Sequence, residues 1–161
     1  KEGKRSVLEP DPVVEGPLDA YIPDDYIDNP RYKMELYRRC ASMEYVEKDD
    51  LLDEIIDRFG NPPEEVINLT RIATVRALCR LIGIRSVTVR QGMVRMVFSE
   101  KALVKAEILV KEIESSKGRM SCTWGKEPVF TYRTTGLRLD LVEWVEKFLP
   151  RIALANKFRV K

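Results

Sequence analysis

The chain has 161 residues, of which 44% are hydrophobic, and this length and composition suit one domain with a substantial core. Lysine and arginine total 28 against 26 acidic residues, so the net charge of +2 does not by itself indicate a polyanionic partner. Histidine is absent, which removes the commonest general base and the commonest metal ligand and counts against most hydrolase and zinc-binding classes.

The N-terminal stretch, residues 1–17, contains three prolines and two glycines without hydrophobic periodicity, and we expect a flexible linker from an upstream domain. The start at Lys1 rather than Met fits a piece of a longer polypeptide. Residues 18–22 alternate apolar and polar side chains and predict one short strand. Asn29-Pro30 is typical of a helix start, with a capping side chain followed by proline in the first turn.

Residues 49–59 predict a short helix that ends at Gly60, with leucines, isoleucines and a phenylalanine on one face. The opposite face carries the acids Asp50, Asp53, Glu54 and Asp57. Glu54 precedes Arg58 by four residues, a spacing that allows an ion pair of about 0.3–0.5 kcal/mol. Asp57 lies in the last turn, where the helix dipole disfavours negative charge. Two interpretations stay open, a solvated helix face and a patch that binds an arginine-bearing partner.

The remaining pattern predicts helices and strand pairs in alternation. The helices are expected at residues 63–82, 99–117 and 139–149, and the strands at 84–90, 93–98, 119–124 and 129–133. The first of these helices is apolar around most of its circumference, so we expect it to be central. The predicted class is a single α+β domain, in which about five helices pack with a small, mostly antiparallel sheet of about four strands plus the short N-terminal strand.

The chain contains no phosphate-binding loop, no dinucleotide fingerprint and no nucleophile elbow. We therefore assign no catalytic residue, no cofactor and no metal to this segment. Cys40, Cys79 and Cys122 lack ligand spacing and are expected to be reduced thiols of a cytoplasmic protein. No apolar run approaches the ~18 residues that a membrane-spanning helix needs.

A basic and aromatic stretch near the C-terminus offers a competing interpretation. It comprises Arg119, Trp124, Lys126, Tyr132, Arg133 and Arg138. On one face of a sheet, such side chains could stack on bases and pair with phosphates. The alternative is that Trp124 and Tyr132 are amphipathic side chains at the rim of a sheet. Glu127 and Asp140 dilute the positive charge, and this favours the rim interpretation.

Several short runs in the first half of the chain resemble the C-terminal domain of the bacterial transcription-repair coupling factor (Mfd) family. They are LDAYIPDDYI at 18–27, Arg31, Tyr37-Arg38-Arg39, EIIDRFG at 54–60 and Pro63. The resemblance is strong from Leu18 to Gly83. From Ile84 onward it extends only to the order of elements and the closing amphipathic helix.

The resemblance implies that residues 18–161 form a non-catalytic regulatory domain of a DNA translocase that displaces stalled RNA polymerase and recruits the repair protein UvrA. The motor, with its ATP and Mg²⁺, would lie upstream of the linker at 1–17. The domain would cover the UvrA-binding face of a UvrB-like domain in the same polypeptide, so UvrA and RNA polymerase would be indirect partners. DNA would be contacted through the full-length protein, and no membrane partner is implied.

In this comparison Glu54 and Asp57 would contact arginines of the covered face, with Asp50, Asp53 and Arg58 beside them. The alternative function is an auxiliary nucleic-acid-binding module of the same translocase.

Overall fold

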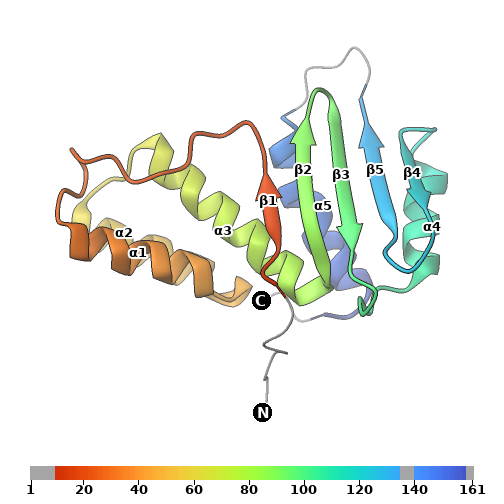
Figure 1. Ribbon diagram of the computed structural model, residues 1–161, viewed down its shortest axis with the longest axis horizontal. Coiled ribbons are helices and arrows are strands. Elements are labelled where there is room, and N and C mark those ends of the chain that lie inside the picture. The colour runs from red at the N-terminus through yellow and green to blue at the C-terminus, as the bar shows by residue number, and fades with distance from the viewer. Residues whose placement is uncertain (1–9, 135–139, 159–161) are drawn as a thin grey trace.

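The computed structural model describes residues 10–134 and 140–158. Within these ranges the elements are β1 Val13–Glu15, α1 Pro30–Ser42, the 3-10 helix η1 Tyr45–Glu47, α2 Lys48–Phe59, α3 Glu64–Ile82, β2 Ile84–Arg90, β3 Met93–Phe98, α4 Ala106–Ser115, β4 Met120–Thr123, β5 Val129–Arg133 and α5 Leu141–Ala155 (Figure 1). This arrangement confirms the predicted α+β class. No helix in the described ranges is long and apolar enough to cross a membrane.

The strands form one sheet in the order β1-β2-β3-β5-β4. β1 runs parallel to β2, and the other neighbouring pairs are antiparallel, so the predicted mostly antiparallel sheet is confirmed. The turn between β2 and β3 uses Gln91 and Gly92 with φ angles of 51° and 76°. Positive φ at both positions is what a two-residue hairpin turn with the right twist requires.

The N-terminal strand lies earlier in the chain than predicted. Residues 18–22 form no strand; they run past the start of α3, where the N–H of Tyr21 donates to the carbonyl of Glu65 at 3.3 Å. The strand is β1, inside the segment 1–17 that the sequence predicts to be a linker, so that prediction is wrong for β1. Three residues are too few to show periodicity, and β1 is ordered by pairing with the distant β2 and by packing of Val14 on the core. An upstream domain stays a prediction.

Helix α3 is shared by two hydrophobic clusters, and its predicted central position is confirmed. The sheet cluster joins the inner face of the sheet to α3 and α5, and its largest fully buried members are Phe98, Phe130 and Phe148. The helical cluster joins α1, α2 and α3 and includes Leu36, Leu51 and Ile55. Along α3, Val66 and Ala73 belong to the helical cluster, whereas Val75 and Leu78 belong to the sheet cluster. In Figure 1, α1 and α2 accordingly lie on one side of α3 and the sheet on the other.

The corner between α2 and α3 is tight. Gly60 ends α2 with a φ of 86°, a conformation that L side chains rarely adopt, in agreement with the predicted stop. Helix α3 then begins at Glu64 with Pro63 at its N-cap and no capping side chain. Asn61 therefore does not cap the helix, because the N-cap position is Pro63, two residues further on.

Helix α4 is shorter than predicted, because it begins at Ala106 rather than next to Ser99. The Ser99 hydroxyl accepts the N–H of Lys101 at 3.1 Å and so closes a local turn instead of capping a helix. Leu103, which lies between Ser99 and the start of α4, is 77% exposed and does not join the apolar stripe of the helix.

Candidate protein-interaction site

Helix α2 has the two-sided character that its sequence predicts. Leu51 and Ile55 are fully buried in the helical cluster. Asp50, Asp53 and Asp57 are exposed on the other side of the helix. The packing therefore turns a row of aspartates outward, and we call these three residues the acidic face of α2.

Glu54 lies at the edge of this face and is held by two arginines. Nη1 of Arg39 on α1 donates to Oε1 at 2.6 Å, and Nη1 of Arg58 lies 3.5 Å from Oε2. The hydrogen bond from Arg39 lowers the pKa of the Glu54 carboxyl and raises the pKa of the Arg39 guanidinium. Glu54 thus fixes α2 against α1, and the pair with Arg58 is confirmed. The sequence did not reveal the bond to Arg39, since only the packing of the two helices brings these residues together.

Arg58 and the end of α2 are set in an aromatic corner. The Arg58 guanidinium lies 5.5 Å from the ring centre of Tyr32 and 4.9 Å from that of Phe59. Tyr26 meets the Phe59 ring edge-on at 6.2 Å, and its hydroxyl donates to the carbonyl of Gly60 at 2.7 Å. Arg58 is therefore a structural neighbour of the acidic face rather than a free cation. The sequence did not show that Tyr26 and Tyr32 lie at the end of α2, because both are far from α2 along the chain.

Asp57 has neither a hydrogen bond nor an ion pair within residues 10–134 and 140–158, and the same holds for Asp50 and Asp53. Asp57 lies in the last turn of α2, where the helix C-terminus disfavours negative charge. The neighbouring Asp49 differs, because Lys48 approaches it at 3.5 Å. The acidic face consequently presents to a binding partner three carboxylates that have no cationic partner in the described part of the chain.

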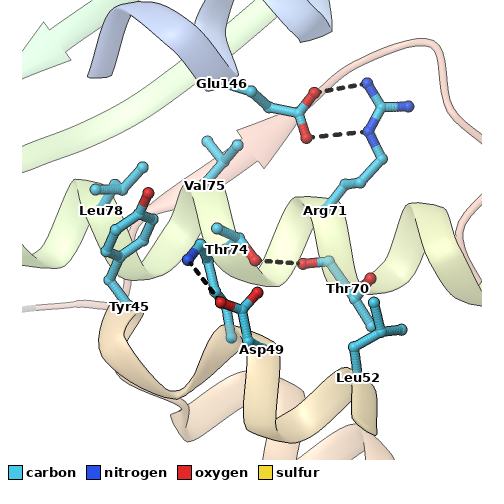
Figure 2. Close-up of a pocket in the computed structure, with 10 residues that line it drawn as sticks. Tyr45, Asp49, Leu52, Thr70, Arg71, Thr74, Val75, Leu78 and Glu146 are labelled. Atoms are coloured by element: carbon cyan, nitrogen blue, oxygen red, sulfur yellow. Dashed lines mark hydrogen bonds and ion pairs between the residues drawn. The ribbon is translucent and has the colours of Figure 1, made fainter. Parts of the chain in front are cut away.

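A groove of about 240 Å³ separates α2 from α5 across the middle of α3 (Figure 2). Figure 2 shows Asp49 on its lower side and the bidentate pair of Arg71 with Glu146 on its upper side, with bonds of 3.0 and 2.7 Å. Lys48 faces Asp49 there, so each charged side chain that lines the groove has a partner of opposite sign. The Arg71–Glu146 pair joins α3 to α5, whereas Lys48 and Asp49 both belong to α2.

The basic and aromatic stretch does not place Tyr132 on an open surface. Tyr132 is buried, and its ring stacks on Trp144 of α5 with centroids 3.9 Å apart and planes 9° apart. Trp124 lines a separate pocket beside α4. Arg138 lies outside the described residues. The interpretation of Tyr132 as a platform for bases is therefore wrong, because its inward strand position places it against α5.

The thiols are poorly placed for chemistry. Burial raises the pKa of Cys40 to about 11 and that of Cys79 to about 12, and it also raises the pKa of Cys122. Since the thiolate is the reactive form, Cys40 and Cys79 behave as small core residues.

Comparison with known proteins places these features in a family. The family model described as the TRCF domain matches residues 17–109. The transcription-repair-coupling factor of Bacillus subtilis (strain 168) is 35% identical over 138 residues, which are 82% of this chain and 11% of that protein. The factor of Mycobacterium tuberculosis (strain CDC 1551 / Oshkosh) is 41% identical over 86 residues, 52% of this chain and 7% of that protein.

A solved structure described as the C-terminal domain of transcription-repair coupling factor has the same fold. Its TM-score is 0.75 at 22% sequence identity, and the match covers 91% of this chain and 94% of that one.

The fold and the acidic face define a small α+β domain with a charged helix as its candidate contact surface. The chain belongs to the TRCF domain family of the transcription-repair coupling factors, and it has the fold of the C-terminal domain of such a factor. It spans about a tenth of the length of the curated relatives that it matches.

Proposed function

We propose that this chain is a non-catalytic regulatory domain of a DNA translocase in transcription-coupled repair, and that it keeps the full protein closed. In the closed state the acidic face of α2, together with Glu54, contacts arginines on a UvrB-like domain of the same polypeptide. That contact covers the surface to which UvrA binds. Recruitment of UvrA then requires release of this domain, which follows engagement of RNA polymerase and DNA by the whole protein.

The observation that carries the proposal is the set of three exposed, unpaired aspartates on a helix whose position is fixed from both sides. Glu54 is bound to Arg39 at 2.6 Å on the α1 side, and the Tyr26 hydroxyl fixes the end of α2 through Gly60 at 2.7 Å. Carboxylates held in a constant pattern favour guanidinium groups, because arginine binds carboxylates through paired, charge-assisted hydrogen bonds. A preorganised pattern of charge also sets the orientation of the partner.

The geometry supports different roles for Glu54 and Asp57 in the proposed contact. Asp57 has both carboxylate oxygens available to an incoming arginine, whereas Glu54 already accepts one strong hydrogen bond from Arg39. A carboxylate offers about four lone-pair sites, so Glu54 retains capacity for a further donor. Asp57 is accordingly the principal contact, and Glu54 contributes partly by holding α2 in place.

The closed state need not be very stable to control UvrA. The apparent affinity of a ligand falls by the fraction of molecules in the binding-competent state. If about 1% of molecules are open, UvrA binds about 100-fold more weakly than to the open form, and this corresponds to a bias of about 2.7 kcal/mol. Interdomain contacts within a chain are typically polar and bury about 600–1,500 Å², and domains joined in this way are expected to move relative to each other.

The direct test is binding of the 161-residue chain, added in trans, to the separately expressed UvrA-binding part of its own full-length protein. Asp57→Lys should weaken this binding at least about tenfold, because it replaces an attractive charge with a repulsive one. Glu114→Lys is the matched control, since Glu114 is also an exposed acid in the last turn of a helix, α4. In the full-length protein Asp57→Lys should raise UvrA affinity. Equal binding by wild type, Asp57→Lys and Glu114→Lys would refute the proposal.

A further inference from the structure

One face of the sheet is not covered by any helix of the described chain. In Figure 1, α3 and α5 lie behind the sheet and α4 lies beside β4, whereas the near face of β2, β3 and β5 is open. The side chains alternate accordingly along the strands. Val94, Met96, Phe130 and Tyr132 are buried on the helix side, and the residues between them point to the open face.

The strand register gathers arginines at one end of this open face. Arg90 of β2 lies opposite Met93 of β3, which lies opposite Arg133 of β5. The carbonyl of Arg119, just before β4, accepts a hydrogen bond from the N–H of Arg133 at 2.8 Å. Arg119 therefore lies beside Arg133 in the same row. Arg95 belongs to the adjoining row. All four arginines are exposed, and neighbouring strands are about 4.8 Å apart, so Arg90 and Arg133 stand roughly 10 Å apart.

We call Arg90, Arg95, Arg119 and Arg133 the arginine cluster. Other arginines of the chain, such as Arg39, Arg71 and Arg151, are paired with acids, but no member of the cluster has an ion pair within the described ranges. In the adjoining row Arg95 lies between Thr88 and Thr131, and Ser121 follows. The acid of that row is Glu15, at the far edge beside Thr88. The surface is thus strongly positive, although the whole chain has a net charge of only +2.

The chemistry of this surface fits phosphate groups better than bases. Arginine and hydroxyl side chains are the usual donors to phosphate oxygens in protein–DNA contacts. The two rows contain no aromatic residue, so the surface lacks the stacking platforms on which single-stranded nucleic acid depends. The next row, Ser86, Val97, Val129 and Thr123, is uncharged, and this confines the positive charge to the hairpin end of the sheet.

We infer that the open face of the sheet binds the sugar–phosphate backbone of duplex DNA through the arginine cluster, without sequence preference. This site is separate from the acidic face of α2, because the sheet and α2 lie on opposite sides of α3 (Figure 1). It does not depend on the proposed masking of the UvrA surface. The site also differs from the basic and aromatic stretch considered from the sequence, because it includes Arg90 and Arg95 and does not involve Trp124 or Tyr132.

The test measures binding of the 161-residue chain to a fluorescent, random-sequence DNA duplex as a function of salt concentration. If each of the four arginines neutralises one phosphate, the slope of log K against log salt is about −3.6, which is a loss of about 150-fold in affinity from 50 to 200 mM salt. The variant Arg90→Gln, Arg95→Gln, Arg133→Gln should retain a slope of about −0.9 and lose only about 3.5-fold over the same range.

A control variant removes the same charge elsewhere. Arg31, Lys105 and Lys111 are exposed and have no ion pair in the described part of the chain, so Arg31→Gln, Lys105→Gln, Lys111→Gln should leave the slope near the wild-type value. The variant Arg90→Lys, Arg95→Lys, Arg133→Lys should retain most of the binding because it keeps the charge, and it shows whether substitution at these positions disturbs the fold. An equal effect of the two glutamine variants would overturn the inference. So would tighter binding to single-stranded DNA or equally tight binding to polyglutamate.

Discussion

Charge reversal at Glu54 should destabilise the domain, whereas charge reversal at Asp57 should not. In the Glu54→Lys variant the bond to Arg39 and the ion pair with Arg58 are lost, and a third cation is placed between these arginines. The side chains of Glu54 and Arg39 are 39% and 43% exposed, so each lost pair is worth well under 1 kcal/mol. Repulsion of similar size adds to the loss. We expect a destabilisation of about 1–2 kcal/mol, which lowers the Tm by roughly 2–8 °C.

The Asp57→Lys variant should be neutral or slightly more stable than wild type. It removes an acid from the last turn of α2 and introduces a cation that the helix dipole favours by about 0.3–1 kcal/mol. It also converts the like-charge spacing between Asp53 and Asp57 into an attractive acid–lysine pair four residues apart. The Tm is expected to stay within about 1 °C of wild type or to rise by up to about 4 °C.

Calorimetry and urea denaturation of both variants, with Glu114→Lys as reference, measure these shifts. The comparison matters for function, because Asp57→Lys then tests the contact with the partner in a domain that is folded as wild type. A loss of stability in Asp57→Lys as large as in Glu54→Lys would refute the reasoning, since it would mean that Asp57 has a stabilising partner within the domain.

Three further predictions concern the scaffold. Gly83→Ala should lower the free energy of unfolding by about 1–3 kcal/mol through backbone strain alone, because φ is 100° there. The added Cβ would also meet the Cα of Ala102 at 2.8 Å, and thermal denaturation measures the combined loss. A double-mutant cycle of Arg71→Gln and Glu146→Gln should give a coupling energy of about 1–2 kcal/mol in urea denaturation, since the pair is bidentate and about three-quarters buried. The pKa of Glu54 is lower in the folded state than its ordinary 4.5, so its stabilising effect is present above that pH and is lost as the pH falls further; the stability difference between wild type and Glu54→Gln should shrink from pH 6 to about pH 3.

Local features of the chain were predictable from sequence because their physical causes are local. The spacing of apolar residues in α2 identifies its buried side, Gly60 marks its end, and Gln91-Gly92 identifies the hairpin turn. Each depends on a few consecutive residues. The class of fold followed from the order of such elements.

The features that could not be predicted from sequence depend on contacts between distant segments. The bond from Arg39 to Glu54 exists only because α1 packs on α2, and each residue alone looks like part of a solvated helix face. Tyr132 has the alternation of a strand residue, but the sequence does not state which side of the sheet α5 will cover. The arginine cluster was missed for the same reason, since Arg90 and Arg133 become neighbours only through strand pairing on either side of β3.

The acidic face of α2 and the arginine cluster are separated by α3, and this separation determines how binding at one surface can affect binding at the other. Val66 and Ala73 of α3 pack in the helical cluster that supports the acidic face, whereas Val75 and Leu78 pack in the sheet cluster beneath the arginine cluster. The acidic face cannot rotate relative to the arginine cluster unless buried residues of α3 lose their packing. Binding at one surface should therefore influence the other through the placement of the whole domain, not through a change in its conformation. Asp57→Lys should accordingly leave the DNA affinity of the arginine cluster nearly unchanged apart from long-range charge, so the two proposals succeed or fail independently.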